Sequence, residues 1–303
     1  MKKNIIKKII VATVSVAMVG GLLAGCGSKN NASNSGTNNG GNSGDSQIIS
    51  GSITTLGSSA LQPLAEATAK TFMEKNKNVT INVQGGGSGA GIKAVVEGTA
   101  EIGNSDVLAD TQVDANIVKD LVDHEVCGIG FAMVVSKDVT VESLTKDQIQ
   151  KIFKGEITNW KEVGGNDAPI NLIHRKTSSG TRATFIETLM DGQEENAELG
   201  TTQPESGGVR DAIKVTDGAI SYLSMSYLTE DVKEDVKVIK IDNVEPTDEN
   251  IIGGQYPFWS YGHMYTKGEA QGTAKAYLDY MVSDENAENV QALGYIPMSK
   301  FSK

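Results

Sequence analysis

The stretch Val83-Gln84-Gly85-Gly86-Gly87-Ser88-Gly89-Ala90-Gly91 places a glycine- and serine-rich loop between a strand-like segment, residues 79–83, and a segment with helical apolar spacing, residues 92–96. Two more loops of this kind lead into helical segments, Gly57-Ser58-Ser59-Ala60 and Ser178-Ser179-Gly180-Thr181. The first turn of a helix leaves backbone N–H groups without partners and carries partial positive charge, so small residues there let an anion approach. Together the three loops predict a cage for an oxyanion.

Segments with strand-like and helix-like patterns alternate along the rest of the chain. Alternating or continuous apolar runs mark strands, and apolar residues at helical spacing mark helices. The expected strands cover residues 48–56, 79–83, 100–105, 126–135, 170–174 and 219–223, and the expected helices cover residues 61–73, 92–96, 147–153, 185–190, 209–215, 272–281 and 285–293. This alternation predicts an α/β fold with mainly parallel sheets flanked by helices. Ligands bind such open sheets at the carboxyl ends of strands, where the three loops lie.

The N-terminal region has the pattern of a targeting segment. Four lysines lie in residues 1–8, an apolar run covers residues 9–23, and Leu23-Ala24-Gly25-Cys26 follows. This pattern resembles the lipobox of bacterial lipoproteins and predicts a signal peptide over residues 1–25, with a lipid anchor on Cys26. The alternative is an unlipidated cysteine beside an ordinary signal cleavage point.

The segment after Cys26 has nothing to bury. Residues 28–46 are almost entirely Asn, Ser and Gly, so we expect a flexible tether over residues 26–46. A lipid anchor, a solvated tether and a large body place the protein at the extracytoplasmic face of the cell membrane.

The charge of the chain limits its partners. The chain has 27 basic and 38 acidic side chains. Four of the lysines precede Cys26, so the mature form has 23 against 38, a net charge of −15. Such an acidic protein is a poor candidate for binding nucleic acid, because phosphate backbones attract positive charge. A bound anion must therefore be held by backbone dipoles and one or two local cations.

The loops resemble, in order and spacing, those of the phosphate-binding proteins of the ABC phosphate importer, the PstS family. The matching motifs are Gly57-Ser58-Ser59-Ala60-Leu61-Gln62-Pro63-Leu64, Val83 to Gly91, Gly103-Asn104-Ser105-Asp106, Arg175-Lys176-Thr177-Ser178-Ser179-Gly180-Thr181-Arg182 and Gly218-Ala219-Ile220-Ser221-Tyr222. The resemblance implies a type II periplasmic-binding-protein fold, in which two α/β lobes joined by a two-strand hinge close over one phosphate. We expect lobe 1 at residues 47–133 plus 256–303 and lobe 2 at residues 134–255.

The resemblance also implies a function. The protein would capture inorganic phosphate and deliver it to the transmembrane subunits of an ABC permease. It would act as a monomer and not as an enzyme, with no cofactor and no metal. The alternative within binding proteins is another tetrahedral oxyanion, such as sulfate, molybdate or tungstate.

The candidate binding residues supply complementary chemistry. Hydroxyl groups and helix-start amides can donate hydrogen bonds to an oxyanion, and the planar fork of an arginine matches it bidentately. The candidate phosphate-binding residues are Ser59, Ala60, Leu61, Ser88, Asp106, Arg175, Ser179, Gly180 and Thr181. For each of Ser59, Ser88 and Ser179 taken alone, a plain helix N-cap is an equally good interpretation.

Asp106 is the candidate selectivity residue. An ionised carboxylate only accepts hydrogen bonds, so it can accept the proton of a protonated phosphate, whereas sulfate offers no proton and would be repelled. One feature departs from the family: phosphate binders often carry Asp two residues after the arginine, and this chain has Thr177. This leaves open how Arg175 is held and whether Arg182 shares its role.

Two enzyme classes are less favoured alternatives. Gly85, Gly87 and Ala90 satisfy G-x-G-x-x-A after a strand, and Asp106 follows at about the distance of a dinucleotide fingerprint. An extracytoplasmic location and two further oxyanion loops argue against this interpretation. A lipoprotein hydrolase would need a G-x-S-x-G elbow, which the sequence lacks, and its three histidines, His124, His174 and His263, show no metal-ligand spacing.

Overall fold

The computed structural model describes residues 49–301. The predicted signal peptide, the predicted tether and Cys26 lie outside the described residues. Across the described part of the chain, no helix combines the length and the apolar character needed to cross a membrane.

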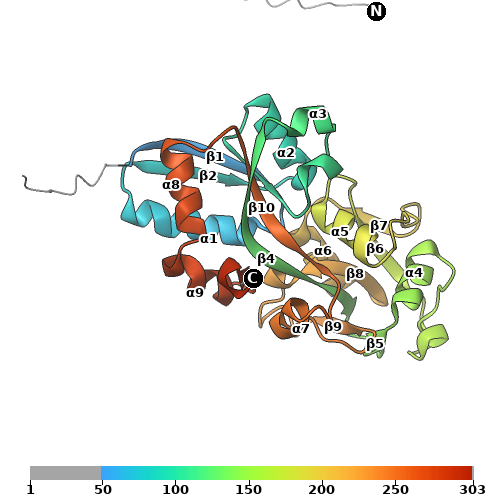
Figure 1. Ribbon diagram of the computed structural model, residues 1–303. Coiled ribbons are helices and arrows are strands. Elements are labelled where there is room, and N and C mark those ends of the chain that lie inside the picture. The colour runs from blue at the N-terminus through green and yellow to red at the C-terminus, as the bar shows by residue number, and fades with distance from the viewer. Residues whose placement is uncertain (1–48, 302–303) are drawn as a thin grey trace, which may run out of the picture. The chain divides into compact units, whose positions relative to one another are not determined.

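Eleven strands of the described chain form one hydrogen-bonded system (Figure 1). Its main path runs β2-β1-β3-β10-β4-β8-β6-β7, with β11 and β9 also paired to β4 and β5 paired to β9. The strands are β1 Gly51–Gly57, β2 Val79–Gln84, β3 Ile102–Ser105, β4 Leu121–Ser136, β5 Ser143–Leu144, β6 Asn171–Arg175, β7 Thr201–Gln203, β8 Ala219–Ser224, β9 Val236–Ile241, β10 Trp259–Lys267 and β11 Ile296–Pro297.

The pairing directions separate the outer strands from the central ones. The pairs β1–β2, β1–β3, β6–β7, β6–β8 and β5–β9 are parallel, as expected from βαβ units. The pairs that β4 and β10 make with each other and with β3, β8, β9 and β11 are antiparallel. The α/β class is confirmed, and the two long central strands make the sheet mixed.

Strand β4 changes its partners partway along its length. Through Gly130 it pairs with β10, and from Phe131 onward it pairs with β8 and β9. The amide of Phe131 also donates to the carbonyl of Phe258, just before β10 begins (3.1 Å). In Figure 1, β4 and β10 run side by side between the strands β1 and β2 and the strands β6 and β8. Two adjacent segments therefore cross between the two groups of strands, close to the lobe boundaries expected at residues 133 and 256.

Nine α-helices accompany these strands in the described chain. They are α1 Gln62–Lys75, α2 Ser88–Glu97, α3 Ala115–Val118, α4 Lys146–Lys154, α5 Gly180–Thr188, α6 Ser206–Val215, α7 Asp248–Ile252, α8 Gly272–Met281 and α9 Asp284–Ala292, and four 3₁₀ turns, η1 Ala109–Thr111, η2 Trp160–Val163, η3 Met225–Tyr227 and η4 Met298–Phe301, complete the set. Every helix expected from the sequence is present. The short helices α3 and α7 were not expected, because four or five residues carry too little periodicity to be recognised.

Local sequence explains where the helices begin and end. Helix α4 starts with a capping box, in which Thr145 accepts from the amide of Gln148 and the Gln148 side chain accepts from the amide of Thr145, and it ends at Gly155 with φ of 80°. Helix α5 starts at Ser179, whose hydroxyl oxygen accepts from the amide of Arg182 (3.2 Å). Such caps satisfy amides that a helix leaves free at its first turn.

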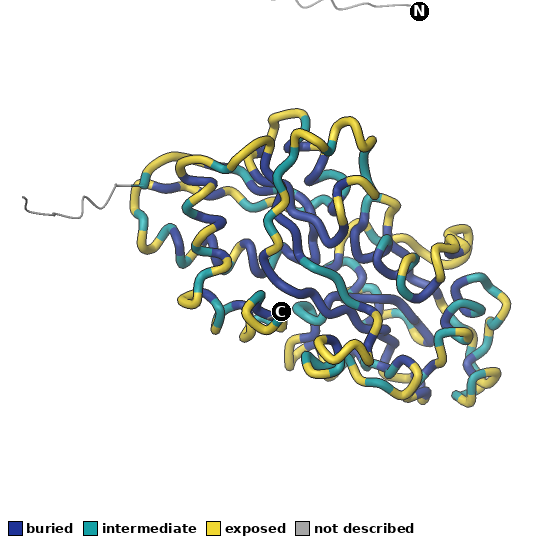
Figure 2. The backbone as a smooth tube through the Cα atoms, in the orientation of Figure 1, coloured by how far each residue is buried: buried dark blue, intermediate teal, exposed yellow. Residues whose placement is uncertain are grey.

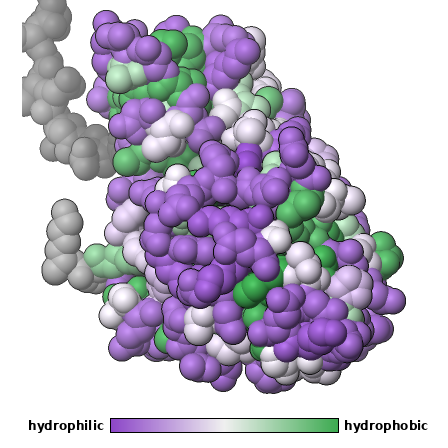
Figure 3. All heavy atoms as spheres, turned by 90° about the vertical axis from the view of Figure 1, so that its right-hand side faces the viewer, coloured by the Kyte–Doolittle hydropathy of each residue, from purple (hydrophilic) through white to green (hydrophobic). Residues whose placement is uncertain are grey.

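The apolar faces of these elements meet in a core that follows the sheet, and exposed residues lie mostly in loops and outer helix faces (Figure 2). Helix α1 packs against α8, and α2 packs against β1 and β3. Cys127 lies in β4 and is fully buried, and this burial raises the pKa of its thiol. It is the packed, unreactive thiol that its apolar run indicates. The face that carries α4 and β7 is largely hydrophilic, with apolar residues only in small groups (Figure 3).

Candidate functional site

The three predicted loops converge at the carboxyl ends of β1, β2, β3 and β6. The amide of Gly89 in the second loop donates to the carbonyl of Ser178 in the third (3.1 Å). The Thr181 hydroxyl donates to Asp106 Oδ2 (3.2 Å), and the amide of Asp106 donates to Ser88 Oγ (3.0 Å). The structure thus brings together residues that lie nearly a hundred positions apart in the sequence.

Two glycines make this close approach possible. Gly87 has φ of 93°, and a Cβ atom there would lie 2.7 Å from the carbonyl oxygen of Ser178. At Gly180 a Cβ atom would lie 2.8 Å from the Cβ of Asp106 and would also clash with the Ser88 hydroxyl. A larger side chain at either position would separate the second loop from the third.

Arg175 is the last residue of β6 and is only 2% exposed. Its guanidinium donates to neutral oxygens alone: Nη1 to Ser206 Oγ (3.2 Å), and Nη2 to Ser59 Oγ (3.1 Å) and the carbonyl of Pro204 (3.5 Å). Its Nε has no partner, and no carboxylate of the described residues lies within ion-pair distance. Burial lowers the pKa of Arg175 from its ordinary value, and the nearby charge of Asp106 opposes that effect. Arg175 is therefore a buried cation without a fixed counter-ion.

Asp106 follows β3 and is 1% exposed. Its Oδ1 accepts a hydrogen bond from the Ser58 hydroxyl, and its Oδ2 accepts one from Thr181. Burial raises the pKa of Asp106, while the hydrogen bond from Ser58 and the charge of Arg175 act in the opposite direction. The site therefore combines one buried carboxyl and one buried guanidinium that are not bonded to each other.

The helix start before α1 differs from the expectation. The amides of Ala60 and Leu61, predicted to face an anion, both donate to Ser58 Oγ (3.1 Å each). The Ser58 hydroxyl thus satisfies two amides of the turn that precedes α1. Ser59, in contrast, faces Arg175 and the Ser206 hydroxyl (3.1 Å).

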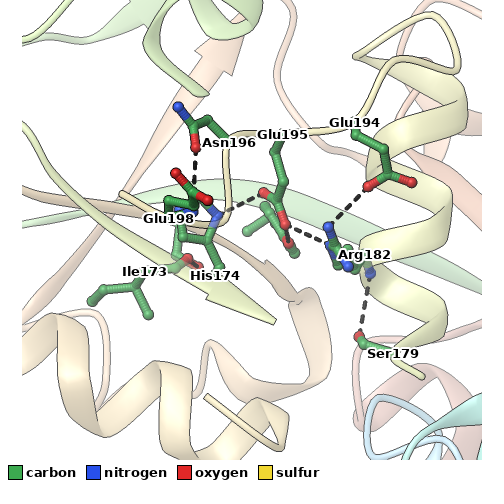
Figure 4. A network of polar contacts seen from close by, with 10 residues as sticks. Ile173, His174, Ser179, Arg182, Glu194, Glu195, Asn196 and Glu198 are labelled. Carbon is green, nitrogen blue, oxygen red and sulfur yellow. Dashed lines mark hydrogen bonds and ion pairs between the residues drawn. The ribbon is translucent and has the colours of Figure 1, made fainter. Parts of the chain in front are cut away.

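The side chain of Arg182 is held by two carboxylates (Figure 4). Its Nε donates to Glu195 Oε1 (2.6 Å) and its Nη2 donates to Glu194 Oε2 (2.9 Å). Glu195 is buried, its Oε1 also accepts from the Tyr222 hydroxyl (3.0 Å), and its Oε2 lies 2.8 Å from Nδ1 of His174. The charge of Arg182 is therefore neutralised inside the protein. Thr177, where an aspartate was expected from the family, is exposed.

Sequence reasoning missed a fourth helix start. Ser206 begins α6, is fully buried, and donates its amide to Ser59 Oγ (3.1 Å) while its hydroxyl accepts from Arg175. The Tyr227 hydroxyl also joins the site by donating to the carbonyl of Ser59 (2.8 Å). The signal for Ser206 was present, because Ser206-Gly207-Gly208 precedes a helical apolar stripe as in the other loops.

The arrangement does not favour the enzyme alternatives. Amides of the glycine loop that a dinucleotide would need are used within the chain, since Gly87 donates to the carbonyl of Gly57 (2.9 Å) and Gly89 to Ser178. Within residues 49–301, no group of three or more His, Cys, Asp or Glu residues is placed to hold a metal ion. His263 contacts Asp123 (3.0 Å) and His124 contacts Thr266 (3.1 Å), on the paired strands β4 and β10.

Known proteins resemble this chain over most of its length. The model of the PBP superfamily domain matches residues 32–285. The phosphate-binding protein PstS of Bacillus subtilis (strain 168) is 45% identical over 302 residues, which cover 99% of this chain and 96% of that relative.

Two solved structures are also similar. A putative phosphate ABC transporter substrate-binding protein with bound phosphate, from Clostridium perfringens, is 32% identical with a TM-score of 0.74, covering 82% of this chain and 99% of the other. An ABC-type phosphate transport receptor from Vibrio cholerae is 26% identical with a TM-score of 0.64, covering 80% and 99%. The comparisons confirm the fold class and the resemblance that the loop motifs carried.

Proposed function

This chain belongs to the PBP superfamily, among its phosphate-binding members, and from that premise we propose that it captures inorganic phosphate between two lobes and delivers it to an ABC permease. The names of its relatives supply the ligand and the transport role. The buried site described above supplies the residues. The protein acts by binding and performs no chemistry.

One observation carries the assignment of the site: Arg175 is a buried cation whose hydrogen bonds all go to neutral oxygens. A buried charge without a partner is costly, so the site favours a ligand of opposite charge. A tetrahedral oxyanion fits the planar fork of the guanidinium and the surrounding hydroxyl donors. A phosphate ion would supply the negative charge that no neighbouring side chain of the described residues brings within ion-pair distance of Arg175.

The other site residues have distinct roles in this proposal. The hydroxyls of Ser59, Ser88 and Ser179 and the amide of Gly180 donate to phosphate oxygens from the starts of the helices, and the Thr181 hydroxyl joins them when it leaves Asp106 Oδ2. In this proposal the amides of Ala60 and Leu61 do not contact phosphate, because they donate to Ser58 Oγ. Ser206 adds a further donor beside Arg175.

Asp106 decides between phosphate and sulfate. As a carboxylate it accepts the proton that a phosphate monoanion or dianion carries, whereas sulfate leaves two anions facing each other. A buried acceptor that the wrong ligand leaves unsatisfied is a strong basis for rejection, on the order of 10⁴-fold. The alternative cargo, another fully ionised oxyanion such as sulfate, molybdate or tungstate, is disfavoured on the same ground.

Lobe closure would couple binding to delivery. The exchange of partners along β4 and the antiparallel pairing of β10 beside it support a hinge of two crossing segments near residues 130 and 258. Contacts to phosphate from both sides of this hinge would shift the population toward a closed form that the permease recognises. One chain supplies all the loops, which supports a monomer.

The location follows from the N-terminal region. The pattern ending at Cys26 supports a lipid anchor, and the tether over residues 26–46 leaves the body free to move at the extracytoplasmic face of the cell membrane. Globomycin, which blocks lipoprotein signal cleavage, would make the precursor accumulate if this proposal is right. Normal processing in its presence would remove the anchor from the proposal.

Calorimetric titration of the ligand-free mature protein with phosphate and then sulfate at neutral pH tests the function. We expect one-to-one phosphate binding and no heat from sulfate. Binding of sulfate or molybdate in place of phosphate would keep the two-lobed architecture and change the cargo. No response to any oxyanion would reject the proposal.

A further inference from the structure

Ser58 is not among the predicted phosphate-binding residues. It is 1% exposed, and its Oγ accepts hydrogen bonds from the amides of Ala60 and Leu61 (3.1 Å each). A hydroxyl oxygen has two acceptor lone pairs and one proton. With both acceptor positions occupied, the Ser58 hydroxyl has only its proton left to give, and that proton goes to Asp106 Oδ1.

This geometry makes Ser58 a donor that cannot reverse its role. A free hydroxyl beside a carboxyl group rotates and either donates to a carboxylate or accepts from a protonated carboxyl. The two amides lie in the turn just before α1 and occupy both acceptor positions of the Ser58 oxygen, so this oxygen cannot accept a further hydrogen bond. The Ser58 hydroxyl therefore supports only the form of Asp106 in which Oδ1 is an acceptor.

The second oxygen of Asp106 is less constrained. Its partner, the Thr181 hydroxyl, donates at 3.2 Å and has no second contact that fixes its orientation. Ser59, the neighbour of Ser58, cannot replace it, because its hydroxyl is engaged with Arg175 and Ser206. Of the two hydroxyls on Asp106, only that of Ser58 is held in one orientation.

We propose that Ser58 is a positioning residue for anion selectivity: its fixed hydroxyl keeps Oδ1 of Asp106 free of a proton and favours the ionised carboxylate, so that Asp106 accepts a hydrogen bond from the ligand and donates none. This inference rests on the proposed function and adds to it the residue that enforces the choice of protonated oxyanions. A neutral Asp106 would donate to sulfate and would weaken its rejection.

The surroundings of Asp106 leave this role to Ser58. The ionisable groups facing Asp106 are Arg175 from β6, His263 from β10 and Cys127 from β4. Burial raises the pKa of Asp106, and the Ser58 hydrogen bond is the largest influence that lowers it. Removing the Ser58 hydroxyl therefore moves the protonation of Asp106 to higher pH.

Ser58→Ala tests the proposal in the mature protein. The ratio of sulfate to phosphate dissociation constants is measured by calorimetry across a range of pH, for the wild type and the variant. A hydrogen bond to a charged group is worth enough that we expect this ratio to fall about tenfold at neutral pH. The pH at which sulfate rejection fails should also move upward. If Ser58 had only a structural role, the variant would bind both anions more weakly by the same factor, and the ratio would stay unchanged.

Ser136→Ala is the matched control. Ser136 is also a buried serine that accepts from a backbone amide, that of Ala219 (3.0 Å), but it lies at the end of β4 and contacts no residue of the site. We expect its removal to lower stability and to leave the ratio as in the wild type. Ser58→Thr, which keeps the hydroxyl, should restore rejection of sulfate.

The outcomes separate this inference from the proposed function. If the wild type binds no phosphate, the proposed function fails, and this inference fails with it. If the wild type rejects sulfate and folded Ser58→Ala rejects it as sharply over the whole pH range, only the role of Ser58 is wrong. If Ser58→Ala does not fold, Ser58→Cys, with its weak thiol donor, takes its place. A lowered ratio in that variant supports the proposal, and an unchanged ratio overturns it.

Discussion

Two arginines seven positions apart show opposite solutions to the burial of a positive charge. Arg175 is 2% exposed and Arg182 is 6% exposed, so both are largely removed from water. Arg182 contacts the carboxylates of Glu195 and Glu194, whereas Arg175 contacts only neutral oxygens. The chain therefore neutralises the charge of Arg182, whereas the charge of Arg175 remains for a ligand to neutralise. Of the two arginines that the sequence places in one motif, the comparison supports Arg175 as the proposed binding cation.

Arg175→Ala gives the largest expected effect. It removes the charge and two donors of the proposed site, so phosphate affinity should fall about 10³- to 10⁴-fold, measured by calorimetry. Arg175→Lys keeps the charge without the planar fork and should lie between the wild type and the alanine variant. If Arg175→Ala binds phosphate with an affinity within tenfold of the wild type, Arg175 is not the binding cation.

Arg182→Ala should act on stability instead. It leaves the buried Glu195 without its cation, which costs about 3 kcal/mol in the free energy of unfolding, measured by urea denaturation. Phosphate affinity of the folded variant should change less than tenfold. Glu194→Ala is the control, because this side chain is 73% exposed and its ion pair contributes little. A loss of binding with unchanged stability would reverse the roles of the two arginines.

Asp106→Asn tests whether the carboxyl group of the proposed site selects the anion. The amide carries no negative charge to repel sulfate, and its NH₂ can donate to that anion. We expect sulfate affinity to rise about 100-fold while phosphate affinity falls, measured by paired titrations. If the variant still excludes sulfate as strongly as the wild type, Asp106 does not select the anion.

The pH dependence of the wild type should show the same effect on a smaller scale. Burial raises the pKa of Asp106, so its carboxyl becomes neutral at a higher pH than an exposed aspartate. Discrimination against sulfate should be greatest at neutral pH and above, and should fall about tenfold as the pH is lowered through this pKa. In Asp106→Asn this pH dependence should disappear. If the pH dependence persists in this variant, a group other than Asp106 causes it.

The raised pKa of Asp106 also predicts how the stability of the fold changes with pH. For a carboxyl that is harder to ionise in the folded state, stability is full below the unfolded pKa, falls as the pH rises through the folded pKa, and stays lower above it. The ligand-free Asp106→Asn variant should therefore be as stable as the wild type or more stable at neutral pH, and this advantage should vanish in acid. Thermal unfolding at a series of pH values measures it. A variant less stable than the wild type at every pH would contradict this expectation.

Strong local patterns made most of the fold predictable. Helices α1, α4, α6 and α8 carry apolar residues at helical spacing over nine or more residues, and α4 also begins with a capping box. Strand β9, Val236–Ile241, was not singled out, although its apolar and lysine residues alternate. The antiparallel pairings of β4 and β10 were not predicted either, since an apolar run does not reveal the direction of its neighbour.

The candidate site residues that lie in or beside the loop motifs were predictable from the sequence. Ser88, Asp106, Arg175 and Thr181 were all expected, and the structure brings them together through contacts such as that between Thr181 and Asp106. Ser206 was missed because a Ser-Gly-Gly start before a helix is common and becomes informative only beside Ser59 and Arg175.

The α/β class, the positions of the glycine loops and the residue types available to bind an oxyanion could be read from the sequence, because these depend on local periodicity and turn chemistry. Which residues face one another became clear in the fold: Glu195 neutralises Arg182 and not Arg175, and Ser58 accepts from two amides of the turn before α1 while it donates to Asp106. Burial and hydrogen-bond partners arise from contacts between segments far apart in the chain. A charge or hydroxyl therefore acquires its role when the fold brings its partners to it.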